Sequence, residues 1–361
     1  EGVAIMDSKF NFGYSSSFTH EMFDYKKANN MTANYGTITA CDSNGCHGSQ
    51  VAAIAAGEFV SASDADNMIG VAWAAKIHAT QSGNISESGL EHTTNGTIDA
   101  DNNYAAIVQN NSWGPGSSIY CSIDVVRAAA CNTFGWNDST VITYSDISEI
   151  KFAEGLSWDQ TYAFFLAGSA ASSSVTKFQN YVTALNNFQD TGVIVFANGN
   201  TYTEDEGNAL AALPLNYSQL AEAWISVGWI EIQGSSISSS NVKRGSGTGG
   251  NQCGSLAAFC VVAPGGDYMV PNYQDADDYE RVHGSSFAAP AVSGSIAILA
   301  QAFPNHTPEQ LVDRLLASAN NSFFTISAFT NFANGVKHGY NAEFGHGIPD
   351  IYGALSPINS S

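Results

Sequence analysis

Short apolar runs that end at a polar residue constrain the fold of this chain most strongly. Val3–Met6 ends at Asp7, and Val193–Ala197 ends at Asn198-Gly199-Asn200. Such runs are typical of strands that are buried on both faces, as in a parallel sheet. The Ala-rich segment Gly48–Ala56 lies between them and is expected to form a helix. This alternation predicts an α/β fold built on a parallel sheet.

The same patterns place the other elements. Strands are expected over Lys76–Gln81, Ala105–Val108, Ile225–Trp229 and Ala258–Ala263. Helices are expected over Thr176–Gln189, Ser286–Phe303 and Pro308–Ser318, the last with Thr307 as its N-cap. Open α/β sheets hold their ligand sites at the carboxyl ends of the strands. The polar residues that follow these strands are therefore expected to gather in one site.

Length and composition favour a single domain. The 361 residues allow one large domain or two ordinary ones, and no linker or internal repeat divides the chain. We therefore expect one domain over residues 1–361. The stretch from about 115 to 175 is rich in Ser and Ala and fits the strand–helix alternation less well. We interpret it as an insertion beside the site.

The charge balance excludes two classes of partner. The chain carries 33 acidic and 12 basic residues, a net charge of −21, which disfavours binding to nucleic acid or anionic membrane surfaces.

No apolar run reaches the roughly 18 residues of a membrane span. The longest candidate, Ala288–Phe303, is interrupted by Ser293, Ser295 and Gln301. We expect no membrane span in this chain.

The six cysteines indicate the compartment. They fall into three close pairs: Cys41/Cys46, Cys121/Cys131 and Cys253/Cys260. Pairing within each is the simplest interpretation, although six cysteines allow 15 connectivities. Three disulfides predict an oxidising environment and thus an exported protein. Free core thiols are the alternative. A metal site is disfavoured because no second Cys-x-x-Cys or His cluster completes a ligand set.

Three residues in separate segments are of the types that acyl-transfer chemistry needs. Asp7 ends a buried strand, where a carboxylate requires a partner such as the N–H of His47. His47 is expected to act as general base and then as general acid. Ser286, the nucleophile, begins an apolar helix whose free N–H groups favour developing negative charge. Pro290 is expected in the first turn of that helix, where its missing N–H costs little.

Two further segments complete the candidate site. Asn200 offers a side-chain amide that can donate to an oxyanion, and Ser286 offers its backbone N–H. Gly199, directly before Asn200, is expected to bind substrate. In Ser112-Trp113-Gly114, the glycine allows a substrate backbone to pair as an added strand, and Trp113 is expected to flank the specificity pocket. Taken singly, each residue has an ordinary interpretation as a turn, cap or core side chain. Their coincidence favours catalysis.

Two acidic clusters are open to three interpretations. One follows Asn200 and the other precedes Ser286; they comprise Glu204, Asp205 and Glu206, and Asp275, Asp277, Asp278 and Glu280. Either cluster fits a structural calcium site, because calcium prefers carboxylate-rich ligand sets. Either also fits recognition of basic substrate residues. The third interpretation is a solvated surface on an acidic protein. The metal content is therefore unknown, and the chemistry itself requires no cofactor.

The motifs resemble those of the subtilisin-like serine peptidases, family S8, over nearly the whole chain. The family's Asp-Ser/Thr-Gly, His-Gly-Thr-His and Gly-Thr-Ser-Met-Ala-Ala-Pro motifs are similar to Asp7–Lys9, His47–Gln50 and Gly284–Pro290. The order Asp, His, Ser along the chain is that of subtilisin. Lys9 replaces a glycine of the family pattern. Gln50 replaces a histidine that is not catalytic in the family.

The resemblance implies a three-layer fold, with a central, mostly parallel sheet and helices on both faces. It implies that Asp7, His47 and Ser286 form a catalytic triad, that Asn200 is the oxyanion donor, and that Ser112–Gly114 is a pocket wall. The implied function is a secreted serine endopeptidase that hydrolyses polypeptide substrates through an acyl-enzyme intermediate.

A narrower resemblance points to the autotransporter-type subtilases. It rests on the segments Cys253–Gly265, Leu213–Gly228 and Phe344–Asp350 and on Phe287 after the nucleophile. It implies an exported passenger domain at a bacterial cell surface, with a propeptide and a β-barrel translocator outside this sequence. The alternatives are a non-catalytic passenger and an esterase or transpeptidase with the same triad. The acid-adapted sedolisins use Glu as base and Asp at the oxyanion position, so His47 and Asn200 disfavour them.

Overall fold

The computed structural model describes most of the chain. It covers residues 2–10, 21–23, 31–35, 41, 45–59, 69–82, 86–115, 121, 131, 142–244, 249–272 and 279–356. The predicted acidic residues Asp275, Asp277 and Asp278 lie outside the described residues, as does much of the expected insertion between 116 and 141.

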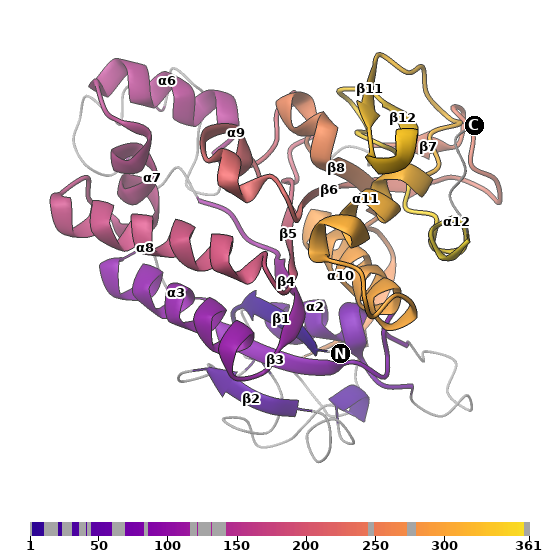
Figure 1. The fold of residues 1–361 in the computed structure, drawn as a ribbon, viewed down its shortest axis with the longest axis horizontal. Helices are drawn as coiled ribbons and strands as arrows, with labels where there is room; N and C mark the ends of the chain where they lie inside the picture. Colours follow the sequence, from indigo (N-terminus) through magenta and orange to yellow (C-terminus); the bar gives the residue numbers. More distant parts are fainter. Residues whose placement is uncertain are drawn as a thin grey trace.

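A central sheet organises the molecule (Figure 1). Over the described residues its strand order is β2-β3-β1-β4-β5-β6-β7, and β8 also pairs with β6. Every pair is parallel except β6–β7. The strands are Gly2–Asp7 (β1), Met31–Tyr35 (β2), Lys76–Gln81 (β3), Ala106–Asn111 (β4), Val193–Ala197 (β5), Trp224–Ile232 (β6), Val242–Lys243 (β7) and Cys260–Pro264 (β8).

Helices cover both faces of this sheet, which confirms the predicted three-layer α/β fold. Along β1, Val3 and Ile5 join one apolar cluster, and the alternate residues Ala4 and Met6 join another. The first cluster includes residues of α2 (His47–Ala56), α10 (Ser285–Ala302) and α11 (Pro308–Ser318). The second includes residues of α3 (Glu87–Asn102), α7 (Trp158–Ala167) and α8 (Ser172–Phe188).

Smaller elements complete the described fold. The short helices are Tyr144–Glu154 (α6), Leu213–Asn216 (α9) and Ile351–Leu355 (α12). Four 3₁₀ turns are Glu21–Phe23 (η1), Ser218–Leu220 (η2), Gly254–Phe259 (η3) and Ala333–Gly335 (η4). Two antiparallel hairpins pair Tyr268–Pro271 (β9) with Tyr279–Val282 (β10), and Ala328–Asn331 (β11) with Lys337–Tyr340 (β12).

The α3 helix has no counterpart among the predicted elements because its buried face is small and polar. Thr93, Thr94 and Thr97 are buried, and each hydroxyl donates to a carbonyl one turn back along the helix. Gly96 packs where a Cβ would lie 2.3 Å from the Thr80 side chain. A helix that satisfies its own buried hydroxyl groups needs few apolar residues, so it lacks the periodic signal that predicts helices.

Some local predictions are wrong. Ala105 has φ +46° and lies before β4, which begins at Ala106. Ala258 and Phe259 belong to η3 instead of β8, which begins at Cys260. Pro290 lies in the second turn of α10, not in the first, because the helix begins at Ser285. Of the described helices, α10 alone is long and apolar enough to cross a membrane, and 72% of it is buried within the protein, as in a core helix.

A histidine pair, one ring buried and one partly buried, ties the β11–β12 hairpin to its neighbours. His346 is fully buried, and its Nδ1 lies 3.0 Å from Nδ1 of His338. The Nε2 of His338 lies 2.9 Å from the carbonyl oxygen of Ala319, and the Nε2 of His346 lies 3.3 Å from the Thr330 hydroxyl. The Nε2 of His346 also lies 3.1 Å from the carbonyl oxygen of Ala258. Because a carbonyl oxygen only accepts, the neutral pair carries its protons on Nε2 of His338 and Nε2 of His346.

Acid should destabilise the fold through this pair. Burial, followed by the charge of His338, lowers the pKa of His346 from 6.5 to about 4. The unfolded chain would bind this proton at the ordinary pKa, so the free energy of unfolding should fall between pH 6.5 and 4, by on the order of 3 kcal/mol. Denaturant unfolding across this range measures it. His346→Gln should flatten the dependence and His306→Gln should not; an unchanged slope in His346→Gln would refute the assignment.

Candidate active site

Asp7 and His47 meet where β1 ends and α2 begins. Asp7 is buried, and its Oδ1 lies 2.7 Å from Nδ1 of His47, the first residue of α2. The same oxygen accepts the backbone N–H of Ser8 at 2.7 Å. At Gly48 a Cβ would lie 2.8 Å from the Ser8 carbonyl oxygen, so the glycine lets the helix approach this loop. The structure therefore brings the predicted acid and base into direct contact.

The Asp7 carboxylate changes the proton affinity of the imidazole. Burial by itself lowers the pKa of His47, but the charge of Asp7 and the hydrogen bond to it outweigh burial, so this pKa lies above 6.5. The imidazole stays 35% exposed and can be reached from the solvent side. A carboxylate at Nδ1 also directs Nε2 away from the strand, which is the arrangement a general base requires.

Ser286 is the second residue of α10, close to the imidazole. The ring of the next residue, Phe287, lies 5.5 Å from the His47 ring. The Ser286 hydroxyl donates to the carbonyl oxygen of Ser112 at 3.1 Å, and the described residues show no hydrogen bond between Ser286 and His47. The Ser112 hydroxyl in turn donates to the Ser286 carbonyl oxygen at 2.9 Å. Contacts between nucleophile and base are often incomplete before substrate binds.

The Asn200 amide is held with its donor free. Its Oδ1 accepts the backbone N–H of Ser285 at 2.7 Å and the Ser285 hydroxyl at 2.9 Å. Because a backbone N–H can only donate, these bonds fix which side of the amide is oxygen. The Asn200 side chain is exposed, and its Nδ2 has no partner among the described residues. This nitrogen can donate to a ligand.

The turn that carries Asn200 is braced by Ser285 and Asn251, which sequence reasoning missed. Gly199 has φ +115°, and its N–H donates to the Ser285 hydroxyl at 3.1 Å. A Cβ on Gly199 would lie 2.6 Å from Oδ1 of Asn251, which itself accepts the N–H of Thr201 at 2.8 Å. Gly199 thus positions the turn. Ser285 directly precedes Ser286 in the sequence, and this position is the signal from which its contact with the Asn200 turn could have been predicted.

The Ser112–Gly114 segment leaves β4 beside Ser286. A Cβ on Gly114 would lie 2.0 Å from Nδ2 of Asn208, and this amide donates to the Trp113 carbonyl oxygen at 3.2 Å. The glycine is therefore required by Asn208 in this structure. The partly buried Trp113 ring packs 6.0 Å from Phe196 in the core. Its role at a specificity pocket stays a prediction.

The structure joins the cysteines in the three expected pairs. The Cα–Cα distances are 4.6 Å for Cys41–Cys46, 5.8 Å for Cys121–Cys131 and 6.0 Å for Cys253–Cys260. Cys46 directly precedes the base as the N-cap residue of α2. The first disulfide therefore closes the loop that leads into His47.

The described acidic residues near Asn200 are already engaged. Glu206 accepts the backbone N–H and the hydroxyl of Ser255, and Asp205 accepts the Gln252 amide at 2.7 Å. Burial raises the pKa of Glu204, with smaller effects from Asp146 and Asp205. Among the described residues, no three His, Cys, Asp or Glu side chains are close enough to hold a metal ion. Calcium binding stays a prediction.

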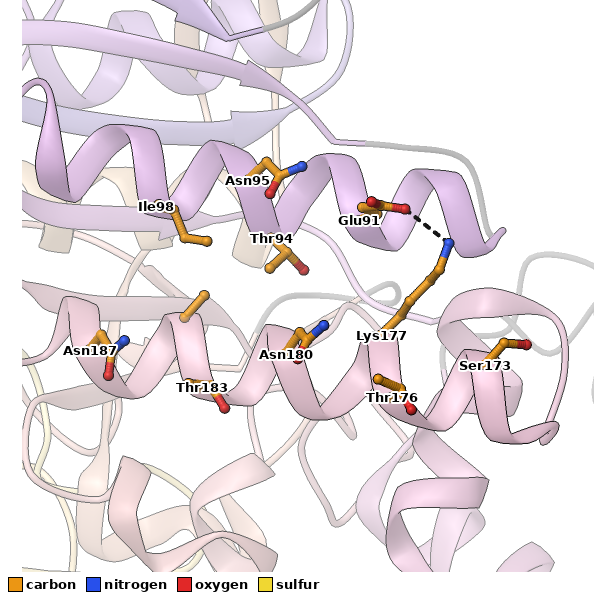
Figure 2. A pocket seen from close by; sticks show the side chains of 11 residues that line it. Glu91, Thr94, Asn95, Ile98, Ser173, Thr176, Lys177, Asn180, Thr183 and Asn187 are labelled. Carbon is orange, nitrogen blue, oxygen red and sulfur yellow. Dashed lines mark hydrogen bonds and ion pairs between the residues drawn. The ribbon is translucent and has the colours of Figure 1, made fainter.

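A separate groove of about 570 Å³ lies between α3 and α8 (Figure 2). Hydroxyl and amide side chains line most of it. Lys177 of α8 reaches across to Glu91 of α3 at 2.9 Å. None of the predicted site residues belongs to this groove.

Comparison with models of known protein families identifies the family of this chain. The family model of the subtilases, Peptidase_S8, matches residues 2–347. The chain belongs to the subtilase family. The family resemblance that the sequence motifs carry is thereby confirmed.

Two curated relatives share part of their length with the chain. The extracellular serine protease of Serratia marcescens is 26% identical over 315 residues, which cover 80% of this chain and 26% of that protein. Serotype-specific antigen 1 of Mannheimia haemolytica is 30% identical over 134 residues, which cover 35% of this chain and 13% of that protein. The chain thus matches about an eighth to a quarter of the length of these relatives.

Solved protease structures share the fold of this subtilase. A mutant of the protease domain of PatA has a TM-score of 0.58 at 19% identity, covering 100% of this chain and 96% of that chain. The prenylagaramide maturation protease PagA has a TM-score of 0.57 at 17% identity, with 99% and 94% coverage. MycP1 without its N-terminal propeptide has a TM-score of 0.53 at 20% identity, with 100% and 92% coverage.

Removing the Asp7 charge should reverse the pKa shift of His47. In Asp7→Asn the burial of the imidazole remains while the carboxylate charge is lost, so the pKa should move from above 6.5 to below it. NMR titration of the ring protons measures this value directly. Asp99→Asn is the matched control, because Asp99 pairs with the buried His78 at 3.0 Å instead. A His47 pKa that is the same in wild type and Asp7→Asn would contradict the electrostatic coupling.

Proposed function

We propose that this chain is an exported serine endopeptidase that hydrolyses peptide bonds in polypeptide substrates. The observation that carries the proposal is the 2.7 Å contact between Asp7 and His47 at the start of α2, beside the helix terminus that holds Ser286. The Nδ2 of Asn200 supports it: no described residue accepts its hydrogen bonds, and an amide donor close to the nucleophile is what an oxyanion requires. Membership of the subtilase family is independent support.

In the first half of the proposed reaction, the Ser286 hydroxyl leaves the Ser112 carbonyl and turns to His47. Its oxygen attacks the substrate carbonyl carbon while Nε2 of His47 takes its proton. The resulting oxyanion accepts hydrogen bonds from Nδ2 of Asn200 and the N–H of Ser286. The carbon–nitrogen bond then breaks, and His47 gives its proton to the leaving amine, so that an ester on Ser286 remains.

The second half repeats these roles with water as the nucleophile. His47 takes a proton from a water molecule, whose oxygen attacks the ester carbonyl carbon, and the same two donors stabilise the new oxyanion. The ester bond to Ser286 then breaks, and the serine oxygen regains its proton from His47. Asp7 keeps its charge throughout and stabilises the imidazolium. We propose that the chemistry requires no cofactor, because every step uses groups of this chain and water.

Three lines of support favour export. The three disulfides require an oxidising compartment. A relative that aligns with 80% of the chain is named as an extracellular serine protease. The motifs shared with autotransporter-type subtilases favour a passenger domain that works with a propeptide and a β-barrel translocator. No observation favours the non-catalytic or esterase alternative.

The nucleophile assignment predicts the loss of both labelling and cleavage in one variant. Wild-type protein should react covalently with a fluorophosphonate probe and cleave a mixed peptide library, because an activated serine does both. Ser286→Ala should do neither, and Ser295→Ala, on the same helix, should do both. Mass spectrometry reads both assays and also gives the sequence preference. Cleavage that survives in Ser286→Ala, or a folded wild type without activity, would refute the proposal.

The bracing of Asn200 predicts a graded effect on turnover. Removal of the corresponding amide donor from subtilisin lowers kcat on the order of 100- to 1,000-fold, and Asn200→Ala should behave similarly. Ser285→Ala should lower kcat by about tenfold, since it removes one hydrogen bond that orients the amide. KM should change little in both variants. The double variant should be no worse than Asn200→Ala; full additivity would show that Ser285 acts independently of the amide.

A further inference from the structure

The position of Pro290 leaves the carbonyl of the nucleophile residue without its helical partner. In an α-helix, the N–H of each residue donates to the carbonyl four residues earlier. Position 290 lies within α10 and should serve the carbonyl of Ser286, but proline has no N–H. The carbonyl oxygen of Ser286 must therefore find a donor outside its own helix.

The Ser112 hydroxyl supplies that hydrogen bond. Ser112 follows β4 and is buried, and its Oγ donates to the Ser286 carbonyl oxygen at 2.9 Å. The return contact, from the Ser286 hydroxyl to the Ser112 carbonyl oxygen, is 3.1 Å long. The two serines are therefore joined twice, once through each carbonyl. The bond from Ser112 fixes the Ser286 backbone, and with it the starting point of the nucleophile side chain.

A buried chain of donors keeps the Ser112 proton directed at Ser286. The Ser112 hydroxyl has one proton, and it accepts a hydrogen bond from Nδ2 of Asn110 at 2.9 Å. Oδ1 of Asn110 accepts in turn from the Ser293 hydroxyl at 3.0 Å. The Ala289 carbonyl oxygen, 3.1 Å from the same hydroxyl, is also the helical acceptor of the Ser293 N–H, so it keeps a partner when the hydroxyl proton points to Asn110. Asn110 and Ser293 have no exposed surface, so water does not compete with these contacts. If the amide were reversed, Ser112 would donate to Asn110 and the Ser286 carbonyl would lose its partner.

We propose that Ser112 is a positioning residue for the nucleophile: its hydroxyl replaces the N–H that Pro290 lacks, and Asn110 and Ser293 set its direction. This inference rests on the proposed role of Ser286 as the nucleophile. It revises the role expected for Ser112 from the sequence, because the side chain acts on the enzyme's own helix and not as a wall that binds substrate.

The two roles differ in their kinetic signatures. A positioning role predicts that Ser112→Ala lowers kcat, and the rate of fluorophosphonate labelling, by about tenfold with KM nearly unchanged, as expected for one lost hydrogen bond. A wall that binds substrate predicts a higher KM with an unchanged labelling rate. The second result would overturn the inference.

Rescue at position 290 gives the sharpest test. Pro290→Ala restores an N–H that can donate to the Ser286 carbonyl, so the Ser112 hydroxyl becomes dispensable. Ser112→Ala should therefore cost about tenfold in kcat when Pro290 is present and less than about twofold in the Pro290→Ala background. Equal losses in both backgrounds would overturn the inference. Ser286→Ala is measured alongside. Activity retained in this variant would refute the proposed function, whatever the double-mutant cycle of Ser112→Ala and Pro290→Ala shows.

Two matched pairs keep the test decisive if Pro290→Ala does not fold. Ser112→Thr keeps the hydroxyl, and Ser112→Val has the shape of threonine without the hydroxyl. The Thr variant should therefore retain most of kcat, whereas the Val variant should show the reduced kcat of Ser112→Ala. Equal losses in these two variants would overturn the inference. On α10, Ser293→Ala should lower kcat a few-fold. Ser295→Ala should not, because each hydroxyl contacts a carbonyl one turn back but Ser293 alone also contacts Asn110. Thermal unfolding confirms that each variant is folded.

Discussion

The parallel pairing of β1, β4 and β5 is the constraint on which the site depends. These strands are neighbours in the sheet, and Met6 pairs with Asn111, which pairs in turn with Phe196. Because parallel strands end at the same edge, the residues that follow each of them emerge together. Asp7, Ser112 and Asn200 come from segments far apart in sequence, yet the register alone delivers them to one edge. Side chains then adjust a geometry that the backbone has already set.

Helix α10 brings Ser285 and Ser286 to the edge of the sheet. Buried residues of this helix, from Ala288 in the first turn onward, belong to the apolar cluster on one face of the sheet, so packing in that cluster holds the start of the helix. The two serines at this helix terminus make different contacts. The Ser285 hydroxyl donates to Oδ1 of Asn200 and orients its amide, and the Ser286 hydroxyl donates to the carbonyl oxygen of Ser112. Each hydroxyl thereby links the helix to the end of a different strand. The site is a junction of three segments held by short polar contacts.

Residue types and their order along the chain were enough to predict which residues form the site. They were not enough to predict the contacts between those residues. The sequence shows which carboxylate, imidazole and hydroxyl belong together, because each follows or begins a recognisable buried element. It does not show that the Ser286 hydroxyl rests on a carbonyl oxygen, or that Asn208 is the reason for Gly114. Those facts depend on tertiary approach distances, which local patterns do not encode. The α3 helix was missed for a related reason: threonine hydroxyls bonded to their own helix look, in sequence, like a polar surface.

The spacing of the cysteines has a consequence for how this chain oxidises. Each disulfide joins residues only 5, 10 or 7 positions apart, whereas cysteines of different pairs are separated by much longer stretches. Loop-closure entropy rises with the logarithm of loop length, so in an unfolded chain each cysteine meets its native partner more often than any other, by roughly 20-fold or more. Correct pairing among the 15 possible connectivities therefore does not require the native fold. All three disulfides can therefore form while the chain is still unfolded.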